Sequence, residues 1–168
     1  MRTPLLIAFA LLGTGSASAA EEPNGCDKFK WPIEHERAAL TAPDRIKLAS
    51  GAELAAVPTT GITLALLATA EAKLPTPPER APKEGTLAGF ARFKDAPKAG
   101  VYTIGLSTGA WLDVVQDGHA LKPKGFSSAT GCEGIRKAMK YEISASPFVV
   151  QVSGARENAL SVAILPSD

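Results

Sequence analysis

The residues of this sequence best suited to bind a ligand lie close together near position 115. Trp111 and Asp113 are two residues apart, so in an extended chain both side chains point to one face of the strand. His119 follows directly after Asp117-Gly118. An aromatic ring beside a carboxylate can stack on a sugar or another small ligand and accept its hydrogen bonds. We predict a ligand site at Trp111, Asp113 and His119. The alternative interpretation places Trp111 in the core and gives Asp113 a role in capping a loop.

The two histidines suggest a second chemistry, a metal site. A non-haem iron site needs two histidines and a carboxylate around open coordination positions. His35 and His119 just supply this number, with Glu34 or Asp113 as the carboxylate. Their spacing gives no support, because His35 and its neighbour Glu34 diverge if the segment is helical. The alternative function is therefore a small metal-dependent oxygenase or hydrolase that uses His35 and His119.

Other catalytic patterns are missing from the sequence. Gly125-Phe126-Ser127 lacks the second glycine of a serine nucleophile elbow. The sequence contains no P-loop, no dinucleotide-binding glycine fingerprint and no H-E-x-x-H pair. We therefore expect no catalytic residues and no cofactor. The favoured function is a non-catalytic protein that binds a small ligand, a sugar or a partner protein.

The sequence contains two cysteines, Cys26 and Cys132. In an oxidising compartment an isolated pair is most simply a disulfide. A redox or metal-binding pair is less favoured, because no C-x-x-C spacing and no nearby histidine accompany either cysteine. The predicted bond pins the N-terminal segment against the loop that precedes a late strand.

The first 19 residues have the pattern of a secretory signal peptide. Arg2 precedes an apolar stretch at residues 4–13 that is too short to span a membrane, and Ala17-Ser18-Ala19 is typical of a cleavage site. We predict that residues 1–19 are removed and that residues 20–168 form a single β-sandwich domain. The mature protein is then periplasmic or secreted, with no stable membrane insertion. A retained N-terminal anchor is the alternative.

The charges of the mature chain balance. Without Arg2, the chain has 17 basic residues against 17 acidic ones. Nucleic acids and anionic lipids require a dense positive face. The expected partner is therefore an unknown small molecule or protein, and not a nucleic acid.

Alternating apolar residues predict short strands through most of the mature chain. Tyr102, Ile104 and Leu106 share one face of an extended segment, and Ser107-Thr108-Gly109 can turn the chain. Residues 101–117 thus predict two strands that form a hairpin, and Asp117-Gly118 predicts the next hairpin. Further strands are expected at residues 45–49, 52–57, 62–68, 85–94, 119–122, 135–143, 148–152 and 160–164.

The remaining segments predict one helix and several connections. Pro32, followed by glutamates in the first turn, predicts a short helix at residues 32–40. The proline-rich residues 74–83 are expected to connect the two sheets, residues 123–134 to form a loop, and residues 153–155 to form a turn. Together these elements predict a mainly β fold. We expect an antiparallel two-sheet β-sandwich of jelly-roll type with one short N-terminal helix.

Four segments carry a resemblance to known proteins. They are CDKFKW at 26–31, GAWLDVVQDG at 109–118, GCEGIRK at 131–137 and QVSGA at 151–155. With the exported N-terminus, they resemble a family of small exported bacterial β-sandwich proteins of unknown function. Some members of that family carry the label homogentisate 1,2-dioxygenase, and this label implies the metal-dependent alternative above. The hairpin region is also similar to sandwich modules of secreted enzymes, including carbohydrate-binding ones, at the level of fold only.

Overall fold

A computed structural model describes residues 21–96 and 98–167 of the chain. The predicted signal peptide at residues 1–19 lies outside the described residues. In chain order the elements are η1 (Cys26–Lys28), α1 (Glu34–Thr41), β1 (Ile46–Leu48), β2 (Ala52–Ala56), β3 (Ile62–Ala65), β4 (Leu67–Ala68), β5 (Leu87–Asp95), β6 (Gly100–Leu106), β7 (Trp111–Gln116), β8 (His119–Ala120), β9 (Gly125–Ser128), β10 (Lys137–Ile143), β11 (Phe148–Ala155) and β12 (Ala159–Pro166).

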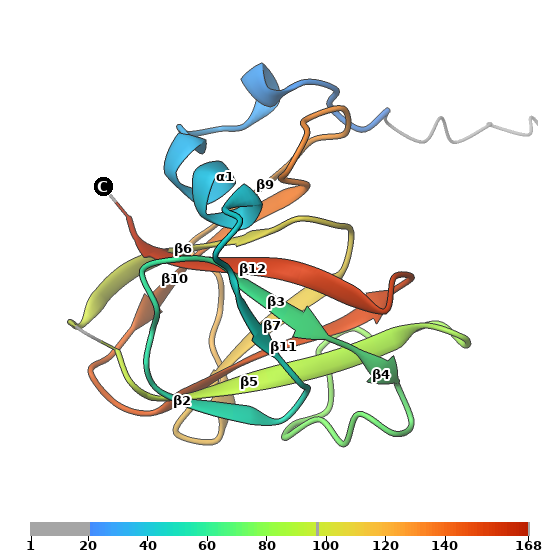
Figure 1. Ribbon diagram of the computed structural model, residues 1–168, viewed down its shortest axis with the longest axis vertical. Helices are drawn as coiled ribbons and strands as arrows, with labels where there is room; N and C mark the ends of the chain where they lie inside the picture. Colours follow the sequence, from blue (N-terminus) through green and yellow to red (C-terminus); the bar gives the residue numbers. More distant parts are fainter. Residues whose placement is uncertain (1–20, 97, 168) are drawn as a thin grey trace, which may run out of the picture.

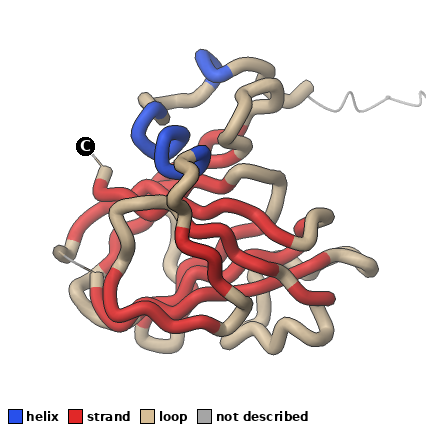
Figure 2. The backbone as a smooth tube through the Cα atoms, in the orientation of Figure 1, coloured by secondary structure: helices blue, strands red, loops and turns tan. Residues whose placement is uncertain are grey.

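The strands form two sheets that pack face to face (Figure 1, Figure 2). The first sheet has the order β1-β3-β12-β6-β10-β9, and the second has the order β2-β5-β11-β7-β8, with β4 also paired to β5. Alternate residues of both sheets meet in one core, in which Ile104 and Leu106 face Val114 and Val152 and none of the four has measurable exposure. The mainly β, two-sheet prediction with one short helix is confirmed.

The sheets are mixed, whereas the sequence predicted antiparallel strands throughout. β1 pairs with β3 in parallel, and β2 pairs with β5 in parallel. After β1 the chain passes through β2 in the other sheet before it returns as β3. A strand that returns after such a crossover can run parallel to its neighbour. The jelly-roll topology stays a prediction.

The predicted hairpin at residues 101–117 is wrong. β6 pairs with β10 and β12 in the first sheet, while β7 pairs with β11 and β8 in the second. Residues 107–110 therefore form an arch from one sheet to the other. Packed sheets lie about 10 Å apart, a distance that four residues can span. The same turn residues serve a hairpin or an arch, and distant strands decide which one forms.

The hairpin predicted at Asp117-Gly118 is confirmed. Gln116 pairs with His119 across the turn. Asp117 has φ 53° and Gly118 has φ 78°, the positive values that a type I′ turn requires at both central positions.

Three predicted connections differ from the structure. The proline-rich residues 74–83 join β4 to β5, which pair within one sheet, so they do not connect the two sheets. Residues 125–128, predicted as part of a loop, form β9 because they pair with β10. Residues 153–155, predicted as a turn, continue β11 through an irregularity in its pairing with β5.

Helix α1 covers the outer face of the first sheet, against β6 and β12 (Figure 1). Gly105 in β6 permits this contact, because a Cβ there would lie only 3.2 Å from Leu40 and 3.3 Å from Glu36. A second apolar cluster fills this layer and consists of Phe29, Ile33, Leu40, Ala129, Cys132, Ile135, Ala138 and Ala163.

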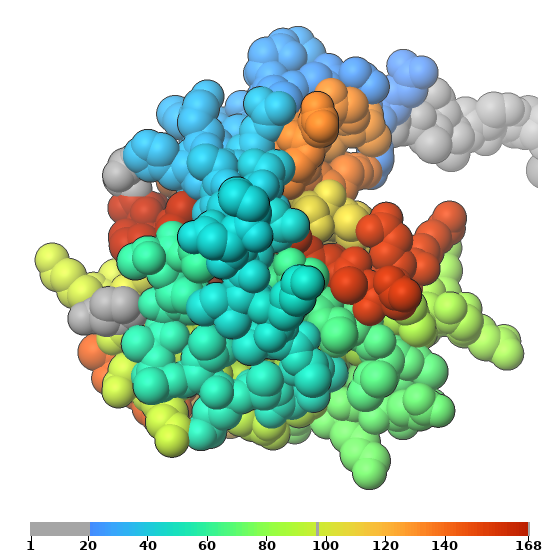
Figure 3. Space-filling view, in the orientation of Figure 1, coloured from blue at the N-terminus to red at the C-terminus, as the bar shows by residue number. Residues whose placement is uncertain are grey.

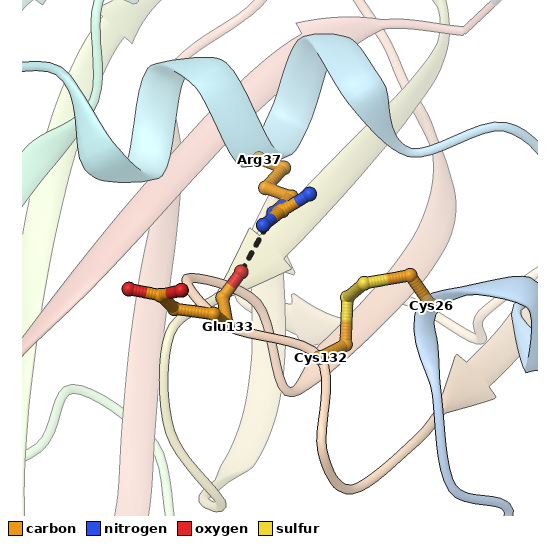
Figure 4. The surroundings of a disulfide bond; sticks show 4 residues. All are labelled: Cys26, Arg37, Cys132 and Glu133. Atoms are coloured by element: carbon orange, nitrogen blue, oxygen red, sulfur yellow. Dashed lines mark hydrogen bonds between the residues drawn. A yellow bond between two sulfur atoms is a disulfide. The ribbon is translucent and has the colours of Figure 1, made fainter.

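The N-terminal segment is held to the loop before β10. The predicted disulfide between Cys26 and Cys132 is confirmed. Close to it, Arg37 Nε donates a hydrogen bond of 2.7 Å to the carbonyl of Glu133 (Figure 4). The space-filling view shows the blue N-terminal segment lying against the orange segment that contains Cys132 (Figure 3). A disulfide of this kind favours an oxidising compartment.

Among the residues that the structure describes, no helix is both long enough and apolar enough to cross a membrane.

Candidate functional site

A pocket lies at the end of the sandwich where the arch at residues 107–110 crosses between the sheets. It has a volume of about 380 Å³. Both sheets, the proline-rich connection and the N-terminal segment contribute to it. The lining residues are Glu22, Arg80, Ala81, Pro82, Lys83, Thr86, Gly109, Ala110, Trp111, Phe126, Ser128, Arg136, Lys137, Ser153, Gly154 and Arg156.

The charged side chains around this pocket are mostly basic. The five cationic residues are Arg80, Lys83, Arg136, Lys137 and Arg156, and the one acidic residue is Glu22. The Glu22 carboxylate forms an ion pair with the Arg136 guanidinium. Four positive charges therefore remain without a carboxylate among the lining residues. A concave site lined by one sign of charge raises the local concentration of ligands of the opposite sign.

Lys137 extends from the start of β10 into the end of the core. It is the single charged residue on the apolar side of that strand. Its Nζ donates a hydrogen bond to the carbonyl of Ala110. It lies 5.8 Å from the ring centroid of Trp111 and 5.6 Å from that of Phe126. Burial lowers the pKa of the Lys137 amine, and the nearby guanidinium groups lower this pKa further. An anion bound beside Nζ would stabilise its charged form.

Trp111 is half-buried at the start of β7, and its ring contacts cations of the pocket. The guanidinium carbon of Arg80 lies 5.9 Å from the ring centroid. The indole Nε1 donates a hydrogen bond of 2.7 Å to Oδ1 of Asp113. The predicted ligand residue Trp111 therefore lies in the pocket, where its ring is close to both Arg80 and Lys137.

Asp113 is the buried hydrogen-bond partner of the Trp111 indole. Its side chain is only 4% exposed, and its Oδ2 accepts a hydrogen bond of 3.3 Å from Nε2 of Gln151. Nε2 of Gln151 also donates to the carbonyl of Thr76 at 3.1 Å, and the Thr76 hydroxyl donates back to the amide oxygen at 3.3 Å. Asp113 is not among the residues that line the pocket. Its role in this arrangement is to orient the indole.

His119 lies apart from this pair. It belongs to the short strand β8 at the edge of the second sheet, its side chain is exposed, and it does not line the pocket. The structure thus brings together Trp111 and Asp113 of the three predicted ligand residues.

The two histidines of the predicted metal site occupy different layers. His35 is on α1, outside the first sheet, beside a smaller pocket of about 190 Å³. His119 is at the edge of the second sheet, so the structure does not bring the two imidazoles together. Within residues 21–96 and 98–167, no group of three or more His, Cys, Asp or Glu side chains is arranged to hold a metal ion.

Ser153 is a pocket residue that the sequence did not indicate. It pairs with Trp111 across β7 and β11, is 2% exposed, and its Oγ has no hydrogen-bond partner within the described part of the chain. Gly154, with φ 71°, follows it at the irregularity of β11. Such irregularities are common near binding sites, where they redirect a side chain. Ser153 is thus a residue of the pocket lining with a buried, unpaired hydroxyl.

Comparisons with protein-family models, curated proteins and solved structures gave no match to this chain. The class of protein is therefore defined by the fold and the pocket alone: a mainly β, two-sheet protein with one disulfide and a basic pocket at one end.

Proposed function

We propose that this protein is a non-catalytic binding protein that takes a small anionic ligand into the pocket between Arg80, Lys137 and Arg156. One observation carries the proposal, namely that five cations and a single carboxylate surround a volume of about 380 Å³. Placing like charges together raises the free energy of the unliganded protein. An anion that neutralises them lowers it, which is a source of affinity. The orphan hydroxyl of Ser153 supplies a hydrogen bond to the same ligand.

We also propose that the protein is periplasmic or secreted and belongs with the small exported bacterial β-sandwich proteins that its motifs resemble. The confirmed disulfide supports this placement, because such bonds persist in oxidising compartments. The proposed ligand is a small molecule and not a nucleic acid, since the pocket has a volume of only about 380 Å³.

Calorimetric titration of mature protein with inorganic phosphate, pyrophosphate and citrate at low ionic strength tests the binding function. Arg80→Gln and Arg156→Gln are each expected to weaken binding at least about fivefold, because each removes a pocket charge. Trp111→Ala is expected to weaken it as well, since the ring positions two cations. The matched control is Lys47→Gln, which removes one exposed charge from β1, outside the pocket.

The titration has a clear negative outcome. Absence of binding to all three anions at millimolar concentration would overturn the proposal. Equal losses of affinity in Lys47→Gln and in the pocket variants would also overturn it, because the effect would then depend only on the net charge of the protein. Circular dichroism of each variant establishes that it is folded before its affinity is interpreted.

A further inference from the structure

Glu22 is the one carboxylate in an otherwise basic pocket, and it already holds Arg136. We infer that this carboxylate stands in for one anionic group of the ligand, so that the ligand is a small compound with at least two anionic groups. One of them replaces Glu22 at Arg136, and the others reach the remaining cations. This inference rests on the proposed anion-binding function.

The two partners of the ion pair are held differently. The side chain of Arg136 is 25% exposed, whereas that of Glu22 is 60% exposed. Arg136 is also fixed by its backbone, whose N–H donates to the carbonyl of Leu106 in the first sheet at 2.8 Å. The Arg136 guanidinium is therefore a fixed part of the site, whereas the Glu22 carboxylate can be displaced.

The chain can release Glu22 without losing the attachment of the N-terminal segment. Thr130 accepts a backbone hydrogen bond of 2.8 Å from Gly25 and donates one of 2.8 Å to Pro23. The disulfide at Cys26 anchors the same segment. Glu22 lies just before these contacts, so rotation of its side chain breaks none of them. Displacement therefore costs only the ion pair.

The number of charges determines the class of ligand. With Glu22 in place, four cationic side chains of the pocket have no carboxylate partner. A ligand with one negative charge that takes the position of Glu22 would only exchange one carboxylate for another at Arg136, and one that binds elsewhere in the pocket would leave three of these four cations without a partner. A ligand with two or more charges fills the position at Arg136 and also neutralises Lys137, Arg80 or Arg156. Di- and tricarboxylates and condensed phosphates share this chemistry.

Removing the negative charge of Glu22 tests the inference. Glu22→Gln is expected to bind pyrophosphate and citrate about two- to fivefold more tightly than the wild type, the effect of removing a competing exposed ion pair. Glu21→Gln changes the same charge one residue away, outside the pocket lining, and is expected to change affinity by less than about 1.5-fold. In an Arg136→Gln background, Glu22→Gln is expected to give no gain. Acetate, with one charge, is expected to bind at least about tenfold more weakly than citrate.

Each result separates this inference from the proposed function. Equal affinities of Glu22→Gln and Glu21→Gln for a polyanion that still depends on Arg80 and Arg156 would overturn the inference and leave the binding function standing. Acetate binding as tight as that of citrate would overturn the requirement for several charges. Failure of wild type and both glutamine variants to bind any of the anions would overturn both proposals.

Discussion

Replacing Cys26 and Cys132 together by alanine is expected to lower the free energy of unfolding by about 2 to 4 kcal/mol. The two cysteines are 106 residues apart. For a closed loop of about 100 residues, the loss of chain entropy in the unfolded state corresponds to about 4.7 kcal/mol at 25 °C. That value is an upper limit, because the folded protein without the bond can release its N-terminal segment and regain part of this entropy.

Urea denaturation of a protein that comprises residues 20–168 measures this loss. The wild type treated with a reducing agent is the control, since it lacks the bond but keeps both side chains. Its free energy of unfolding is expected to agree with that of the double alanine variant. A loss below about 1 kcal/mol in both samples would refute the loop-closure reasoning. A loss confined to the alanine variant would show that the side chains matter and the bond does not.

The same variant reports on the pocket. The disulfide anchors the chain four residues after Glu22, so breaking it weakens the hold on the carboxylate that pairs with Arg136. We therefore expect the double alanine variant to bind pyrophosphate more tightly than the wild type but less tightly than Glu22→Gln, because it keeps the competing carboxylate. Weaker binding than in the wild type would mean that the N-terminal segment shapes the site in another way.

Three further perturbations test the fold and the pocket. Gly61→Ala is expected to destabilise the protein by roughly 3 kcal/mol, because the added Cβ would overlap a backbone carbonyl of α1. The control is Gly100→Ala, whose Cβ would have no atom within 4 Å, and urea denaturation compares the two variants. Asp113→Asn is expected to cost about 1 to 3 kcal/mol in the same assay, because its amide would oppose the Gln151 Nε2 donor, and full stability would contradict this network. Citrate affinity is expected to fall as pH rises through the pKa of Lys137, because the amine then loses its positive charge. Since this pKa is lowered, the fall begins below the ordinary lysine value of 10.5, and Lys137→Gln should abolish this pH dependence. Between the pKa of Lys137 in the folded protein and its value in the unfolded chain, the free energy of unfolding rises with pH, because the unfolded state still holds the proton that the folded state has lost.

Local patterns in the sequence predict the elements of this fold well, and predict their pairing poorly. The alternation of Ile104 and Leu106 with small residues identifies β6, since side chains of a strand alternate between two faces. The turn after β6 has the same local chemistry in a hairpin and in an arch. Its outcome depends on β10, β11 and β12, which supply the actual partners and lie at least 20 residues further along the chain. Local spacing contains no information on these contacts.

In the candidate site too, local patterns could be predicted from the sequence and long-range contacts could not. Trp111 could be predicted because a large aromatic residue beside a carboxylate on one strand face is a local pattern. Arg80 and Arg156 could not, because they come from segments far from Trp111 in the sequence that only the tertiary fold brings to the pocket. Lys137 carries a local signal of its own, because a single cation on the apolar face of a strand must find a polar site at the end of the core.

The positive and negative charges of residues 20–168 balance, and the distribution of charge explains why a basic pocket is compatible with this balance. Of the 17 basic and 17 acidic residues in positions 20–168, five and one respectively line the pocket, which leaves 12 basic and 16 acidic residues elsewhere. We expect the acidic excess elsewhere in the chain to disfavour anions at the rest of the surface, whereas the proposed site attracts them. Extended polyanions such as nucleic acids contact a wide surface and meet this repulsion, whereas a small polyanion can enter the pocket alone. Separation of charge within a neutral chain therefore favours small anions over large ones.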